Sequence, residues 1–232
     1  MSSLEIRGLT AHYGDFQALF GLEIDVDEGD VVAIIGANGA GKSTLLRSIA
    51  GLVRNEAEAI IWDGKPIGAL PANEVVRLGI ALVPEGRRLF PSLTVEENLR
   101  IGGYGGRTGE WTLERVLELF PVLAERCDAP GTALSGGQQQ MVAIGRALLS
   151  NPRLLLCDEI SLGLAPAIII DLYRTLETVN AGGTTLVLVE QDIQQAMSVA
   201  DRVYCLQEGH VTLSGPPHDL THEAIREAYF GL

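Results

Sequence analysis

The stretch GANGAGKST at residues 36–44 decides the fold of this 232-residue chain. It follows the apolar run VVAII at 31–35 and opens the run TLLRSIAGL at 44–52. A glycine, four residues, and then Gly-Lys-Ser between a predicted strand and a predicted helix form the pattern of a phosphate-binding loop. Glycines let the backbone curl so that successive N–H groups turn towards phosphate oxygens. We therefore expect this loop to bind ATP together with Mg²⁺.

Two side chains of the loop have predicted roles of their own. Lys42 places a positive charge at the β- and γ-phosphates, and the Ser43 hydroxyl is a ligand for Mg²⁺. The complete predicted nucleotide-binding set of the loop is Gly36, Ala37, Asn38, Gly39, Ala40, Gly41, Lys42, Ser43 and Thr44.

The distribution of apolar runs predicts an α/β fold. Near-continuous apolar runs separated by helical stretches indicate a mostly parallel sheet that is buried on both faces. These runs lie at 31–36, 79–84, 153–159, 184–190 and 202–207. The first 30 residues and the segment 57–65 have the pattern of short strands with turns, which predicts a small antiparallel flank. We expect one folded unit, with 1–84 and 150–232 as its nucleotide-binding core and 85–149 as a mainly helical subdomain.

Composition excludes several functional classes. A formal net charge of −13 repels phosphate backbones, so we expect no nucleic-acid partner. No apolar run approaches the roughly 18 residues of a membrane span, and the N-terminus lacks the basic start and apolar run of a secretory signal. We expect the protein to stay in the cytoplasm.

The run LLLCDE at 154–159 ends an apolar strand in two carboxylates. An apolar strand has no packing use for them, and alternation along the strand sends the two side chains to opposite sides. Asp158 is suited to hold Mg²⁺, and Glu159 is suited to act as general base on the attacking water. The alternative interpretation is a solvated acidic turn.

The run LSGGQQQ at 134–140 precedes the helical pattern MVAIGRALLS. Ser135 can cap this helix, while Gly136 and Gly137 expose backbone donors at its N-terminus. The chain thus carries a second predicted anion site.

Together these motifs resemble the ATP-binding subunit of ABC transporters, and the resemblance covers essentially the whole chain. It implies that two such domains pack head to tail, so that the LSGGQ signature of one closes over the ATP of the other. Ser135, Gly136, Gly137 and Gln138 would then act in trans. Tyr13, in HYG ahead of the loop, resembles the aromatic residue that stacks on adenine; the alternative is a buried strand tyrosine.

Several positions depart from the family pattern. Glu85 stands where glutamine usually contacts the metal and the attacking water, and Gln191 stands where histidine usually reaches the γ-phosphate. Glutamine donates a hydrogen bond but carries no positive charge, which predicts weaker transition-state stabilisation. In the loop after the carboxylates, Ile160 replaces the usual proline and Leu164 the usual aspartate, which puts communication between two ATP sites in doubt.

The chain is similar to the LivF-type ATPases of branched-chain amino-acid importers in these departures, and also in the segments EGRRLFPSLTVEENL at 85–99 and REAYFG at 226–231. The resemblance implies a heterodimer with a second, non-identical ATPase, two transmembrane permease subunits, and indirectly an external solute-binding protein. It implies a peripheral position on the cytoplasmic face of the membrane. The isolated chain would be a monomer or a weak homodimer. The sequence does not identify the solute.

Two other classes of function remain as alternatives. A soluble ABC ATPase of DNA repair or translation carries two such domains or a long coiled-coil insertion, and residues 45–133 leave no room for one. A regulatory nucleotide-binding module without turnover is favoured by Glu85 and Gln191, and opposed by Asp158 and Glu159.

Overall fold

Strand β3 (Val31–Ile35) leads into the phosphate loop and lies between two parallel strands, β8 (Thr185–Glu190) and β9 (Arg202–Gln207). Strand β10 (His210–Gly215) pairs with β9 in the antiparallel sense. Both β3 and β8 are buried along their whole length, as expected for apolar strands of a parallel sheet. The predicted α/β class is confirmed in this computed structural model, which describes residues 2–105 and 107–230.

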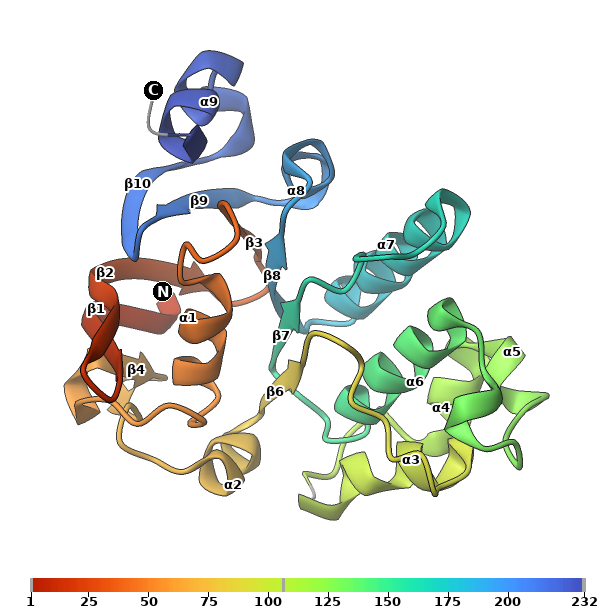
Figure 1. Cartoon of the computed structure of the whole chain (residues 1–232). Coiled ribbons are helices and arrows are strands. Elements are labelled where there is room, and N and C mark those ends of the chain that lie inside the picture. The colour runs from red at the N-terminus through yellow and green to blue at the C-terminus, as the bar shows by residue number, and fades with distance from the viewer. Residues whose placement is uncertain (1, 106, 231–232) are drawn as a thin grey trace. The chain divides into compact units, whose positions relative to one another are not determined.

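The chain divides into two units, and Figure 1 labels the helices and strands of each. The first joins Met1–Val75 to Thr185–Leu232, and the second comprises Val76–Thr184. The mainly helical segment expected at 85–149 lies within the second unit.

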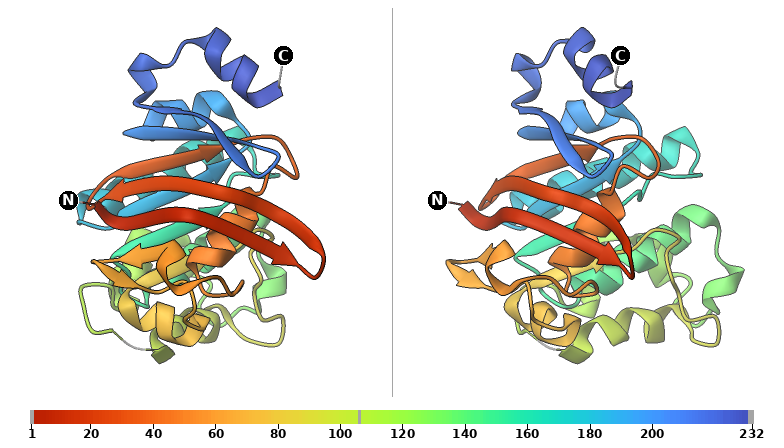
Figure 2. Two further views of the ribbon diagram at one scale, coloured as in Figure 1. Left: turned by 90° about the vertical axis from the view of Figure 1, so that its left-hand side faces the viewer. Right: turned by 60° about the vertical axis from the view of Figure 1, so that its left-hand side comes forward.

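An antiparallel sheet in the order β2-β1-β4-β5 belongs to the first unit, and Figure 2 shows β1 and β2 as two long neighbouring strands. The predicted antiparallel flank is confirmed, but the prediction that the strands within the first 30 residues are short is wrong. Strands β1 and β2 each have 12 residues. The sequence pattern did not predict this length, because a register shift between Ile6 and Leu9 interrupts the alternation of apolar and polar residues that marks a continuous strand. Their bounds are β1 (Ser2–Tyr13), β2 (Phe16–Asp27), β4 (Ile60–Trp62) and β5 (Lys65–Pro66).

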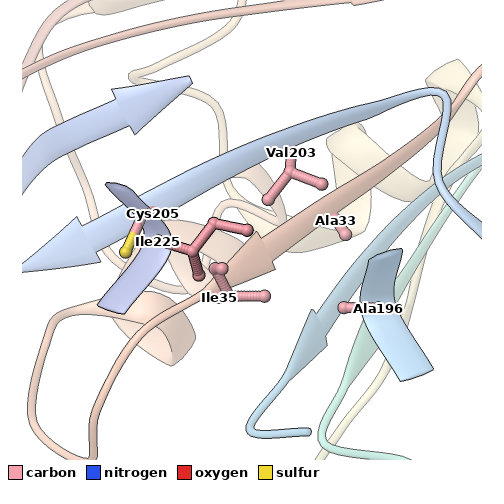
Figure 3. Close-up of a cluster of buried hydrophobic side chains, with 6 residues drawn as sticks. All are labelled: Ala33, Ile35, Ala196, Val203, Cys205 and Ile225. Atoms are coloured by element: carbon pink, nitrogen blue, oxygen red, sulfur yellow. The ribbon is translucent and has the colours of Figure 1, made fainter. Parts of the chain in front are cut away.

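Alternation along β3 and β9 gives the parallel strands two different faces. Figure 3 shows side chains of both strands meeting Ala196 of α8 (Ile193–Val199) and Ile225 of α9 (His222–Phe230). The intervening Tyr204 directs its hydroxyl to the backbone N–H and carbonyl of Asp25 in β2, both at 3.1 Å. Two helices therefore cover one face of the sheet, and β2 is bonded to the other.

The second unit combines the parallel pair β6 (Ile80–Val83) and β7 (Leu154–Asp158) with the helices around the LSGGQ signature. Helix α6 lacks a side chain at Gly145, where a Cβ would come within 2.8 Å of Leu99 and 2.7 Å of Val116. Helices α3 and α4 can therefore approach the backbone of α6 closely. The helices of this unit are α3 (Val95–Ile101), α4 (Leu113–Leu119), α5 (Pro121–Ala124), α6 (Gly136–Leu148) and α7 (Pro166–Ala181).

Short helical turns complete the two units. They are η1 (Ala57–Ala59), α2 (Ala72–Val75) and η5 (Pro217–Asp219) in the first unit, and η2 (Val76–Leu78), η3 (Gly102–Gly105) and η4 (Gly131–Ala133) in the second.

Asn98 holds the segment before α3 in place. Its side chain is fully buried, its Oδ1 accepts from the Phe90 N–H at 2.8 Å, and its Nδ2 donates to three carbonyls. These carbonyls belong to Phe90, Leu93 and Thr94, at 3.1, 3.2 and 2.9 Å. One buried amide thus bonds four backbone groups of this segment.

We predict that Asn98→Leu lowers the free energy of unfolding by about 3 kcal/mol or more, because four backbone groups lose their hydrogen bonds to this buried side chain at once. Urea unfolding measures the change. Asn55→Leu is the matched control, since among the described residues the Asn55 amide donates only to Val53 O. Equal losses in the two variants would contradict the assigned role of Asn98.

Candidate nucleotide-binding site

The phosphate loop joins the buried end of β3 to α1 (Lys42–Ile49). Gly41 caps the helix in a left-handed conformation, with φ at 102°. Residues 37–39 are exposed, whereas the Lys42 side chain is buried and its Nζ donates to the carbonyls of Gly36 at 2.8 Å and Ala37 at 3.2 Å. The lysine ammonium therefore lies across the start of the loop, where it can meet a phosphate that binds there.

Both ends of the loop are glycine because neighbouring strands leave no room for a side chain. A Cβ on Gly36 would overlap the Leu206 carbonyl of β9. A Cβ on Gly41 would come within 2.6 Å of Leu19 Cδ2 and 3.2 Å of Ala18 O, both in β2. The spacing of the motif thus has a packing cause in addition to the expected approach of phosphates.

Tyr13 and Gln191 lie at the same end of the first unit as the loop. Tyr13 is 44% exposed and its hydroxyl is 3.4 Å from Thr44 Oγ1, so the alternative of a buried strand tyrosine is wrong. The register pairs Ile35 with Glu190, so Gly36 and Gln191 leave β3 and β8 at one edge of the sheet. The first unit thus brings together an exposed aromatic ring, the loop and a glutamine amide.

In the second unit, Asp158 is the last residue of β7 and Glu159 follows it directly. Asp158 is 2% exposed, whereas Glu159 is half-buried and has a left-handed backbone with φ at 48°. Such a backbone is unfavourable for a residue with a side chain and is concentrated at functional sites. The two carboxylates thus have different environments, which disfavours the alternative of a solvated acidic turn.

Glu85 leaves the same edge of this strand pair, because the parallel register aligns Val83 of β6 with Cys157 of β7. It is exposed, and it opens a turn in which Gly86, Arg87 and Arg88 all have positive φ, at 73°, 66° and 48°. Glycine adopts this conformation readily, but Arg87 and Arg88 are strained in it, so a partner must hold them. We call residues 85–88 the Glu85 turn.

Arg146, from the last turn of α6, is that partner. Its guanidinium donates to Arg88 O at 2.9 Å and to Arg87 O at 3.0 Å, and it lies 5.7 Å from the centre of the Phe90 ring. Burial lowers the pKa of Arg146 from its ordinary value, yet the two charge-assisted bonds keep the side chain in place. In the sequence, nothing marks this residue beyond a basic side chain near a helix end.

The signature begins α6 as expected. Ser135 accepts from the Gln138 N–H at 3.3 Å, and Gln138 Oε1 accepts from the Ser135 N–H at 3.0 Å, which together form a capping box. The two glycines also have packing roles that the sequence did not reveal. A Cβ on Gly136 would be 3.1 Å from the Arg87 guanidinium, and one on buried Gly137 would be 2.8 Å from Ile168 of α7.

The two departures after the carboxylates have distinct surroundings. Ile160 is 1% exposed and belongs to the apolar core, so it is suited to its place in this chain. Leu164 is half-buried and its N–H donates to Ser161 O at 3.2 Å within a tight turn.

The predicted site residues thus fall into two groups, one in each unit. The first unit holds Tyr13, the phosphate loop and Gln191. The second holds Glu85, Asp158 and Glu159 at one strand edge, with the residues of the signature at the start of α6.

Comparison with known proteins identifies the family in which these motifs occur together. A family model described as "ABC transporter" matches residues 19–161, more than half of the chain. The chain is 45% identical over 235 residues to the high-affinity branched-chain amino acid transport ATP-binding protein BraG of Pseudomonas aeruginosa, covering 98% of this chain and 99% of the relative. It is 35% identical to the probable branched-chain amino acid transport ATP-binding protein LivF of Archaeoglobus fulgidus, covering 97% of each.

Solved structures agree in fold. The ATP-binding subunit of an ABC transporter superposes with a TM-score of 0.84 at 31% identity, covering 99% of this chain and 97% of that one. An ATP-binding cassette in its ADP conformation superposes with a TM-score of 0.82 at 29% identity, covering 98% of this chain and 94% of that one.

We predict that Lys42→Ala abolishes measurable binding of MgATP, because the substitution removes the buried ammonium that lies across the loop. Isothermal calorimetry on the full chain measures the affinity. Lys65→Ala is the matched control, since Lys65 is the other lysine of the sequence and is exposed in β5. Unchanged affinity in Lys42→Ala would contradict the assignment of the loop.

Proposed function

This chain belongs to the ABC transporter family of ATP-binding proteins, and from this premise we propose that it drives an importer for branched-chain amino acids or related solutes. The membership makes it an ATPase. The observation that carries the choice of solute class is the 45% identity to a branched-chain amino acid transport ATP-binding protein over nearly the whole of both chains. The Glu85 turn and Gln191 support the same choice, because they depart from the common family pattern as LivF-type chains do.

For ATP hydrolysis we assign roles to the polar groups that follow the carboxyl ends of the strands in each unit. Lys42 binds the β- and γ-phosphates, and the backbone N–H groups of the loop bind their oxygens. Glu159 accepts a proton from the attacking water, and its strained backbone at the end of a buried strand supports a fixed position for that base. Gln191 donates a hydrogen bond to the γ-phosphate without adding charge.

The oxygen donors of this chain fit a magnesium ion. Ser43 offers a hydroxyl, while Asp158 and Glu85 offer carboxylates, and Mg²⁺ prefers such hard ligands. The Asp158 carboxylate, 2% exposed at the end of an apolar strand, is the kind of buried anion that a cation stabilises. When bound, the ion would neutralise charge on the β- and γ-phosphates; these three residues would hold it.

We further propose that the chain acts as one half of a closed dimer. Subunits of this family dimerise and work with membrane permeases. The capping box leaves the start of α6 suited to receive phosphate oxygens of a partner's nucleotide, with Ser135, Gly136, Gly137 and Gln138 acting in trans. The partner would be a second, non-identical ATPase, with two permease subunits and an external solute-binding protein completing the importer.

A peripheral position on the cytoplasmic face of the membrane follows from this assembly. Among the described residues, no helix has the length and apolar character to cross a bilayer. We retain the proposal that 1–84 and 150–232 act as the nucleotide-binding core and 85–149 as the helical subdomain. The −13 net charge supports the absence of a nucleic-acid partner.

We predict that this chain co-purifies with two permeases and a second ATPase, and that branched-chain amino acids with their binding protein raise ATP hydrolysis of the complex in liposomes. Release of phosphate measures turnover. The matched Glu159→Gln complex should bind ATP and stay closed while its turnover falls by about 100-fold or more, because the base is removed but its volume is kept.

Two outcomes would contradict the proposal. Stimulation by none of these solutes would exclude the importer assignment. Turnover near the normal rate in a complex with Glu159→Gln at this site, and with the partner's site inactivated, would exclude Glu159 as the base.

We also predict that Gln191→His raises turnover at the site built on this chain by several-fold, because a histidine can place positive charge at the γ-phosphate. Single-turnover hydrolysis measures it in complexes whose partner ATPase is inactivated. Gln194→His, on the exposed side of α8, is the control. Equal rates in Gln191→His and the unmodified chain would show that this position does not limit hydrolysis.

A further inference from the structure

The turn between β9 and β10 contacts the phosphate loop from the far end of the sequence. It consists of Glu208 and Gly209, both with positive φ, at 47° and 77°, between the paired residues Gln207 and His210. A two-residue hairpin with this backbone is a type I′ turn. The Gly209 N–H donates to Ala40 O at 3.0 Å, so the tip of the hairpin is bonded directly to the loop.

This bond fixes one peptide plane of the loop. In a trans peptide the carbonyl and the following N–H point in opposite directions. With the Ala40 carbonyl held towards the hairpin, the Gly41 N–H must point away from it. That N–H is one of the loop donors assigned to phosphate, so its direction depends on Gly209.

Strand β2 contacts both the β9–β10 turn and the phosphate loop. The Phe20 N–H donates to Gly209 O at 2.9 Å, and the Phe20 ring stacks on His210 with centroids 4.9 Å apart and planes inclined by 6°. A Cβ on Gly209 would overlap the Ala18 carbonyl and come within 2.7 Å of the Phe20 ring. The same Ala18 carbonyl lies 3.2 Å from the place of a Cβ on Gly41. One short segment of β2 thus touches both the turn and the loop.

We propose that Gly209 is a positioning residue for nucleotide binding, because it holds the Ala40–Gly41 peptide with its N–H directed to the phosphate. The inference rests on the proposed nucleotide site and deepens it. It assigns to the hairpin a role in the affinity for nucleoside di- and triphosphates, with no contact to the nucleotide itself.

The chain offers a matched control for this role. The turn between β4 and β5 has the same form, with Asp63 and Gly64 at φ 49° and 72° between the paired residues Trp62 and Lys65. Nothing lies within 4 Å of a Cβ on Gly64. An alanine at either glycine meets the same left-handed strain, but the one at 209 also pushes against β2, which touches the loop.

The experiment compares Gly209→Ala with Gly64→Ala and Lys42→Ala in the full chain. Calorimetry well below the melting temperatures gives the affinities for MgATP and MgADP. We expect Gly209→Ala to weaken both by about tenfold, since displacements of half an ångström loosen a preorganised site, and Gly64→Ala to stay within about twofold of the unmodified chain. In the assembled transporter, Gly209→Ala should raise KM for ATP while kcat at saturating ATP is kept.

A second variant serves if Gly209→Ala does not fold. Phe20→Ala removes the ring behind the turn and adds no atom, and Phe20 is 41% exposed. We expect it to weaken MgADP binding by about threefold, in line with one loosened contact.

The outcomes separate this inference from the site itself. If Lys42→Ala abolishes binding while Gly209→Ala and Phe20→Ala keep normal affinity, the positioning role is overturned and the site stands. If Gly64→Ala weakens binding as much as Gly209→Ala, the effect comes from general strain and the inference is also overturned. If Lys42→Ala binds normally, the proposed site itself fails.

Discussion

The close packing of backbone against the phosphate loop is the constraint on which the first unit depends. The Leu206 carbonyl of β9 leaves no room for a Cβ on Gly36, and Leu19 and Ala18 of β2 leave no room for one on Gly41. A loop that is clamped at both ends keeps its N–H groups in one arrangement, and such preorganisation is what a polyanion site requires. The antiparallel strands therefore support the proposed nucleotide site in addition to flanking the fold.

A similar constraint orders the second unit. The signature helix α6 receives Arg87 against its first glycine and Ile168 against its second, and Arg146 near its end bonds the strained Glu85 turn. The Glu85 turn thus contacts α6 at both ends of this helix: near the signature through Arg87, and near its last turn through Arg146. A displacement of one would be transmitted to the other, because packed elements move together. This arrangement suits a subunit that must couple a membrane partner to its own ATP chemistry.

Much of this could be predicted from the sequence where the cause is local. The buried strands, the phosphate loop, the carboxylates at the end of β7 and the cap at Ser135 all follow from short patterns with a direct physical meaning. The length of β1 could not be predicted in this way, because the register shift after Ile6 breaks its alternation. The roles of Arg146 and Gly209 also escaped, since each depends on contacts between segments that lie far apart in the chain.

Amide hydrogen exchange across residues 36–44 tests the central claim most directly. If the backbone of this clamped loop binds the phosphates, saturating MgATP or MgADP should slow exchange of the amides from Gly39 to Thr44, while AMP, which lacks the β-phosphate, should leave them unchanged. The same nucleotides should have no effect in Lys42→Ala. Unchanged exchange in the loop of the unmodified chain with ATP bound would contradict the account.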